Sequence, residues 1–254
     1  MISTCIKTFL SAAVPLVLLT GCGSTTSSGS GTDVHVHVTH EPSASLVAPS
    51  ENSKRFTTGG STEVEITQAY LTIGTMDIRT DCSASPFAKL GDSILNVLFP
   101  AAYAHTVSSP TSIGEPLVLD IMANDVTEVE FGDFSPAAGS YCGITVHLHP
   151  ADADARDLPV LVSMTGVVAH IEGVYNTGSG DTSFTVDVTA EPEHADLPFL
   201  TDIVLSASNL TAAVDLNIEY DTWFYAINMS SLAAADPAAL AAFGDNLTAS
   251  IHIK

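Results

Sequence analysis

The chain has 254 residues, with 29 Asp and Glu against only 7 Lys and Arg, and its formal net charge is −22 at pH 7. This balance excludes a surface that neutralises phosphates, so we expect no nucleic-acid partner. The length suits one large all-β domain, or two small ones, with a sizeable core.

Residues 1–21 are typical of a lipoprotein signal peptide. An apolar run of about eleven residues, too short to span a bilayer, leads to small residues and then Cys22. The stretch Leu19-Thr20-Gly21-Cys22 resembles a bacterial lipobox, which predicts cleavage before Cys22 and acylation of that cysteine. The alternative is an ordinary secretory signal with an incidental cysteine. The residue after Cys22 is not aspartate, which favours an outer-membrane anchor facing the periplasm or the cell surface.

Residues 22–60 are rich in Ser, Thr and Gly and have almost no apolar periodicity. Such a segment buries too little surface to offset its ordering entropy, so we predict a lipidated, flexible tether. His35 and His37 lie within it, and they have the spacing of two metal ligands only if this segment is ordered. The single folded domain is then expected over residues 61–254.

From Glu63 onward, apolar residues recur with a period of two, which predicts β-strands. The segments with this pattern are 63–78, 141–149, 167–175, 183–190, 214–220 and 247–253. The first changes parity twice, which indicates a bulged or broken strand, and the third and fourth form a predicted hairpin. We therefore expect an all-β fold, an antiparallel β-sandwich with Ig-like or prealbumin-like Greek-key topology.

Two stretches depart from this period. Residues 87–103 carry apolar side chains at helical spacing and predict a helix or apolar cover inside a long insertion. Residues 231–243 are rich in alanine, and Asp236 and Pro237 are placed as the cap and first residue of a short helix before the last strand.

Cys82 and Cys142 are the only cysteines left once Cys5 is removed with the signal and Cys22 is acylated. Two cysteines in an exported domain most simply form a disulfide. Closing a loop of about sixty residues would stabilise the fold by roughly 4 kcal/mol. The alternative is a free nucleophile or a thiolate metal ligand, which an oxidising compartment disfavours.

Histidine is the residue type whose arrangement suggests chemistry. Alternate residues of a strand point the same way, about 7 Å apart, so His147 and His149 can share one metal ion. Neutral imidazole suits copper or zinc. A third ligand is needed, and the candidates are His170, His105 and His252. The alternative is a pair of exposed strand histidines that hold nothing.

Enzyme signatures are missing from the sequence. It contains no nucleophile elbow, zinc-protease helix motif, phosphate loop or dinucleotide fingerprint, so we expect no catalytic activity. Asp152, Asp154 and Asp157 suggest a calcium loop but lack the glycine and glutamate of an EF-hand. Trp223 and Tyr225 suit core packing better than the aromatic platform of a carbohydrate-binding module.

The apolar run 116–121 and the segment 131–142, in which Ala138-Gly139-Ser140-Tyr141 leads into a strand, resemble uncharacterised bacterial lipoproteins. They are more distantly similar to the methanobactin-partner family of periplasmic copper-binding proteins. This resemblance implies a β-rich fold and copper, and it carries no ligand over to a named position. We therefore expect a membrane-anchored, non-catalytic domain that binds copper or zinc through strand histidines; the alternative is a surface interaction or carbohydrate-binding module. The protein partner and physiological ligand are not predicted.

Overall fold

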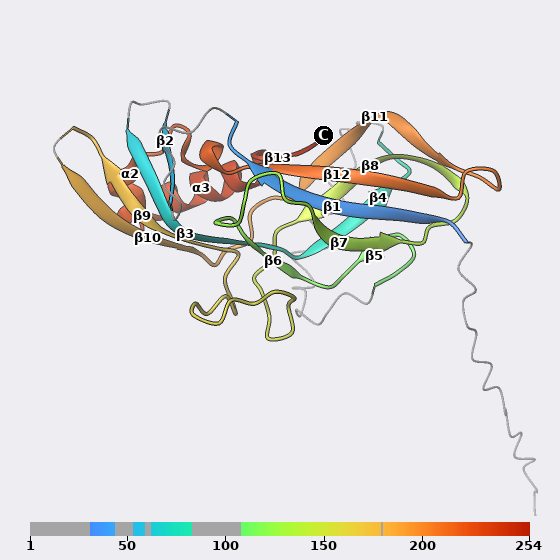
Figure 1. Ribbon diagram of the computed structural model, residues 1–254, viewed down its shortest axis with the longest axis horizontal. Helices are drawn as coiled ribbons and strands as arrows, with labels where there is room; N and C mark the ends of the chain where they lie inside the picture. Colours follow the sequence, from blue (N-terminus) through green and yellow to red (C-terminus); the bar gives the residue numbers. More distant parts are fainter. Residues whose placement is uncertain (1–30, 44–52, 59–61, 83–107, 179) are drawn as a thin grey trace, which may run out of the picture.

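The computed structural model describes residues 31–43, 53–58, 62–82, 108–178 and 180–254, and they form a mostly β structure (Figure 1). The strands are β1 (Asp33–Glu41), β2 (Lys54–Thr57), β3 (Glu63–Ile73), β4 (Thr75–Arg79), β5 (Ser112–Ile113), β6 (Leu117–Asp120), β7 (Val129–Phe134), β8 (Gly139–His147), β9 (Ala169–Asn176), β10 (Asp181–Val188), β11 (Ala195–Leu205), β12 (Thr211–Glu219) and β13 (Ile251–Ile253). The helical segments are η1 (Tyr220–Phe224), α2 (Met229–Ala233) and α3 (Pro237–Ala249). The all-β class is confirmed.

The strands form three sheets, ordered β13-β12-β1-β7, β10-β9-β3-β2 with β6 also on β3, and β11-β8-β4-β5. Strand β1 runs parallel to β12 over its whole length, and the two lie side by side in Figure 1. The purely antiparallel arrangement is therefore wrong for this pair. The reason is topological, because residues 42–210 lie between the two strands, which leaves room for the crossover that parallel pairing needs.

The prediction of a flexible tether over residues 22–60 is wrong for the part of this segment that forms β1 and β2. Val34, Val36 and Val38 are buried in the core, and the residues between them face outward. This segment alternates with a period of two, and pairing with strands on both sides offsets its ordering entropy. The signal peptide and Cys22 lie outside the described residues.

Strands β3 and β4 form one long extended segment that passes from one sheet to another. The register of β3 against β9 shifts between Ile66 and Gln68, and Gly74 separates β3 from β4. The predicted bulged or broken strand is therefore confirmed, as is the hairpin, which is β9 with β10. One main core joins the sheets, and its largest fully buried side chains are Trp223, Tyr220, Phe131, Phe134, Phe224 and Phe243.

Helix α3 begins as predicted. The Asp236 carboxylate accepts hydrogen bonds from the backbone N–H groups of Ala238 and Ala239, and Pro237 follows it. The helix continues to Ala249, however, so the strand expected from residue 247 is wrong at its start. Leu247 is buried one turn after another buried helical residue, and packing of that face decides the conformation. The helix expected over residues 87–103 lies outside the described residues.

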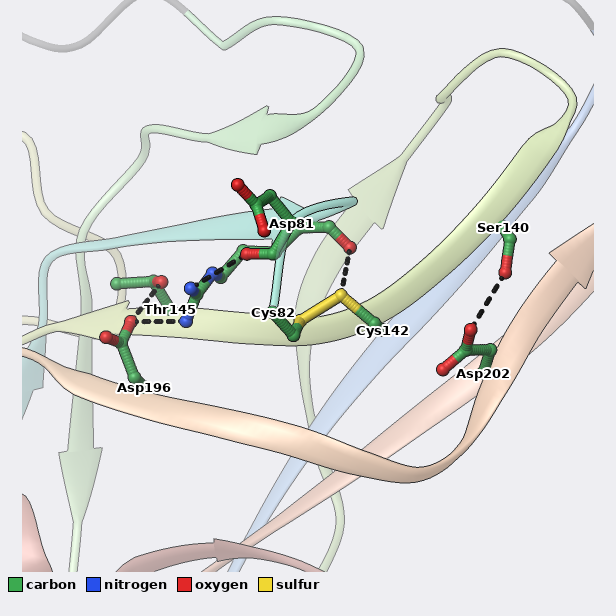
Figure 2. The surroundings of a disulfide bond; sticks show 8 residues. Asp81, Cys82, Ser140, Cys142, Thr145, Asp196 and Asp202 are labelled. Carbon is green, nitrogen blue, oxygen red and sulfur yellow. Dashed lines mark hydrogen bonds and ion pairs between the residues drawn. A yellow bond between two sulfur atoms is a disulfide. The ribbon is translucent and has the colours of Figure 1, made fainter. Parts of the chain in front are cut away.

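The predicted disulfide is confirmed. Cys82, just after β4, is bonded to Cys142 on β8, with a Cα–Cα distance of 5.9 Å (Figure 2). Beside it, the Asp196 carboxylate accepts from the Arg79 guanidinium at 2.8 Å and from the Thr145 hydroxyl at 2.7 Å. These contacts join β4, β8 and β11 next to the crosslink.

Candidate functional site

His147 is the last residue of β8, and His149 lies beside it two residues further on, as their spacing predicts. Their rings are stacked, with centroids 5.6 Å apart and an interplanar angle of 5°. A third imidazole, that of His194, lies with its centroid 5.3 Å from that of His147. We call these three residues the β8 histidine cluster.

Strand pairing brings the three side chains together. In the β8–β11 ladder Ala195 is opposite Val146, so His194, one residue earlier, comes next to His147. On the other side, the Gly74 N–H donates to the His147 carbonyl at 2.8 Å. A Cβ atom at Gly74 would lie 2.5 Å from the His149 side chain, so the ring occupies space that only glycine leaves open.

A carboxylate lies beside each imidazole of the cluster. The pairs are His149 Nδ1 with Glu191 Oε1 at 2.6 Å, His147 Nε2 with Asp77 Oδ2 at 3.4 Å, and His194 Nε2 with Asp196 Oδ2 at 3.6 Å. The hydrogen bond from His147 holds the pKa of the Asp77 carboxyl below its ordinary value, and the Ser112 hydroxyl adds to this effect. The His149 and His147 rings are therefore oriented by hydrogen-bonded carboxylates, whereas His194 lies near the Asp196 carboxylate without a hydrogen bond to it.

The cluster is open to solvent, since 29% of the His147 side chain, 31% of His149 and 51% of His194 is exposed. A histidine that donates one ring N–H to a carboxylate has the outer-shell arrangement typical of metal ligands. Among the described residues, however, no group of three or more His, Cys, Asp or Glu side chains is already arranged to hold a metal ion. A metal ion would therefore require the imidazoles to turn about their side-chain torsions.

The predicted third ligands are not in this cluster. His170, on β9, pairs with Asp187 of the neighbouring strand at 2.6 Å. His252, on β13, lies 3.8 Å from Glu219 at the end of the neighbouring strand β12, in a different sheet from the cluster. Each is oriented toward a carboxylate of its own sheet, and His105 lies outside the described residues. His194 takes the place that sequence reasoning assigned to these residues.

The histidines of the expected tether are ordered on β1 and held apart. His35 Nδ1 lies 2.6 Å from Asp133 Oδ1 on β7, which is one neighbour of β1. His37 Nδ1 lies 3.2 Å from Asp215 Oδ1 on β12, which is the other neighbour. Because the two rings are drawn toward opposite neighbouring strands, this pair is a weaker candidate than the β8 histidine cluster.

The aromatic platform expected for a carbohydrate-binding module is wrong. Trp223 has no exposed surface, and its indole N–H donates to the Ser250 hydroxyl at 2.9 Å. Tyr225 is 65% exposed, but Trp223 is buried and cannot form an exposed platform with it. Core packing of Trp223, the preferred interpretation, is confirmed.

A second cluster of titratable groups is buried where β1, β2 and η1 meet. Lys54 forms an ion pair with Asp125 and donates to the Ala123 carbonyl at 3.0 Å. The Tyr220 hydroxyl donates to Asp125 at 3.2 Å, and its pKa is raised, chiefly by burial and then by Asp125. His40 Nε2 lies 3.2 Å from the same Ala123 carbonyl. Sequence reasoning missed this network, because its members are distant along the chain.

Burial of His40 lowers the pKa of its imidazole, and the nearby Lys54 ammonium lowers it further. As the pH falls, His40 therefore takes up a proton at a higher pH in the unfolded chain than in the folded protein. The contribution of His40 to the free energy of unfolding is therefore complete above about pH 6.5. It is lost as the pH falls from there toward the folded-state pKa. Asp125, Asp120 and Tyr220 also face this site.

We expect His40→Gln to remove part of this acid sensitivity. The measurement is the urea midpoint of both proteins between pH 7.5 and 5, where the difference between them isolates one histidine. If the urea midpoint falls with pH equally in both proteins, His40 is not a source of the acid sensitivity. Replacement of the partly exposed His252 by Gln serves as the matched control and should leave the dependence of the urea midpoint on pH that comes from His40 unchanged.

No protein-family model matches the chain, and no curated protein or solved structure is significantly similar to it. None of the helices in the described ranges has both the length and the hydropathy needed to cross a membrane.

Proposed function

We propose that this chain is an exported, lipid-anchored and non-catalytic β-protein that binds Cu(II) or Zn(II) at the β8 histidine cluster. The observation that carries the proposal is the meeting of His147, His149 and His194, each beside a carboxylate. The resemblance to methanobactin-partner proteins, which rests on short motifs, favours copper.

The chemistry of the donor set supports this class of ligand. Imidazole nitrogen suits copper and zinc, whereas calcium and magnesium prefer oxygen ligands. The net charge of −22 raises the local concentration of cations near the surface. Since the rings must turn before they converge, part of the binding free energy is used for that rearrangement, and we expect micromolar rather than tighter affinity.

Calorimetric titration of the full mature chain with Cu(II) or Zn(II) tests the proposal. We expect His147→Ala/His149→Ala to weaken the strongest site at least about tenfold, the effect of losing roughly 1.4 kcal/mol. His194→Ala should weaken it as well. Gly74→Ala should do the same without removing a ligand, because the new Cβ displaces the His149 ring.

The matched control is His35→Ala/His37→Ala, which removes two strand histidines of the same spacing from β1. If this variant loses the site and the β8 variants keep it, the metal binds β1 instead. If the wild-type chain binds neither metal, the metal-binding function is wrong.

We also propose that Cys22 is acylated after cleavage of residues 1–21, which places the domain at the outer membrane. Cys22→Ala should leave the protein in the soluble fraction, or leave the precursor uncleaved, because the cysteine thiol is the acylation site of a lipobox. Fractionation followed by mass measurement of the mature N-terminus checks this. Normal cleavage with unchanged membrane retention would contradict it.

For the topology, we propose that the sheets stack as a β-sandwich related to Ig-like folds. The continuous core supports this arrangement. So does Tyr141, whose hydroxyl donates to the Ala137 carbonyl four residues upstream at 2.7 Å. A backward bond of this kind from a strand tyrosine occurs in Ig-type sandwiches.

A further inference from the structure

A groove of about 400 Å³ lies between α3 and the connection from β10 to β11. One wall is a single face of α3, because its members recur at spacings of three and four residues: Pro237, Leu240, Ala241, Gly244 and Asp245. The other wall is residues 187–193. The Thr248 hydroxyl donates to the Glu193 carbonyl at 2.8 Å and joins the two walls at one end. The volume is at the lower end of the range for small-molecule sites.

Gly244 keeps this groove open. Glycine inside a helix costs about 1 kcal/mol relative to alanine. A Cβ atom at this position would contact Pro192 Cβ at 3.5 Å, an ordinary van der Waals distance, and would meet nothing else within 4 Å. The fold therefore does not need glycine here. The absence of a side chain at Gly244 leaves open the space between α3 and Pro192.

The groove is lined by apolar and acidic residues together. The apolar members are Val188, Ala190, Pro192, Pro237, Leu240 and Ala241. Four acidic residues are among those that line it, Asp187, Glu191, Glu193 and Asp245, and none of its lining residues is basic. Two of the four already pair with histidines. Within the described part of the chain, the carboxylates of Glu193 and Asp245 have no ion-pair or hydrogen-bond partner.

We propose that this groove binds a small aliphatic polyamine. Methylene segments of such a molecule cover the apolar lining residues, while its ammonium groups pair with the carboxylates of the acidic ones. A bare metal ion gains nothing from apolar lining residues, and a neutral apolar molecule gains nothing from acidic ones. The groove borders the β8 histidine cluster, because Glu191 lines the groove and pairs with His149. Glu193 and Asp245 line the groove and pair with no histidine of the cluster, so a change at these two residues tests the groove.

Calorimetric titration of the full mature chain with spermidine, at about 150 mM salt to screen general surface attraction, tests the proposal. We expect one saturable site. Gly244→Leu fills the space between α3 and Pro192 and Glu193→Gln/Asp245→Asn removes the two unpartnered carboxylates, and each should weaken binding at least about tenfold. Hexanediol, which has a similar stem and no charge, should not bind.

The matched control is Glu128→Gln/Glu130→Gln, which makes the same change in net charge at exposed positions outside the groove and should leave spermidine affinity unchanged. A thermal melt checks that Gly244→Leu folds, and the carboxylate variant decides the question if it does not. Equal losses in the carboxylate and control variants would mean attraction to the whole acidic surface and would overturn the proposal. Absence of a saturable site in the wild-type chain would also overturn it.

Discussion

Replacement of Asp125 by Asn is expected to destabilise the protein by about 3 kcal/mol, because it leaves a buried ammonium group without its counter-charge. The Lys54 side chain is only 8% exposed, and Asp125 is its carboxylate partner. Asp125 also accepts the hydrogen bond of the fully buried Tyr220. Urea denaturation measures this loss as a lower midpoint, while the slope of the free energy of unfolding against urea concentration stays unchanged.

Two further variants show whether the effect comes from the buried charge. Glu128→Gln removes a carboxylate from the same loop at an exposed position, and should change stability by less than about 0.5 kcal/mol. Lys54→Met/Asp125→Asn removes both charges, and should recover part of the loss because no unpaired ammonium remains. If Asp125→Asn and Glu128→Gln have the same effect, the network does not stabilise the fold as described.

Loss of the disulfide between Cys82 and Cys142 is expected to cost about 4 kcal/mol in the chain-entropy model. The bond closes a loop with a sequence separation of 60 residues. The replacement Cys82→Ala/Cys142→Ala should therefore lower the urea midpoint strongly, and reduction of the wild-type protein should have the same effect.

The comparison with and without reductant supplies the control for this prediction. The double variant has no bond to break, so reductant should leave its midpoint unchanged. If reductant shifts the variant as much as the wild-type protein, the loss comes from another cause. If neither reduction nor replacement lowers the midpoint, the crosslink contributes nothing to stability.

Local periodicity accounts for the parts of the fold that were predicted correctly. The alternation of β8 continues past its end and brings His147 and His149 side by side, and Asp236 and Pro237 mark the start of α3. Strand β1 was missed because its Val-His alternation is short and lies in a polar region, and only pairing with β12 and β7 makes it a core strand. The Ser-, Thr- and Gly-rich composition of residues 22–60 as a whole therefore outweighed the local alternation of a strand of nine residues.

The parts of the site that were missed depend on contacts between distant segments. His194 has no local signal, since it meets His147 only through the register of β11 against β8. Lys54 and Asp125 likewise meet only when β2 packs near the loop before β7. Such pairings follow from topology, which a single sequence specifies poorly.

The position of β1 also limits how far an acylated protein can reach. Residues 22–32 span at most about 40 Å even when fully extended, so the domain would stay close to the bilayer. Tension on the anchor would enter at Asp33 and act along β1, whose pairing with β12 extends over all nine residues from Asp33 to Glu41. The hydrogen bonds of that parallel ladder would then be loaded together in shear rather than opened one at a time, so the β1–β12 pair would resist mechanical extraction.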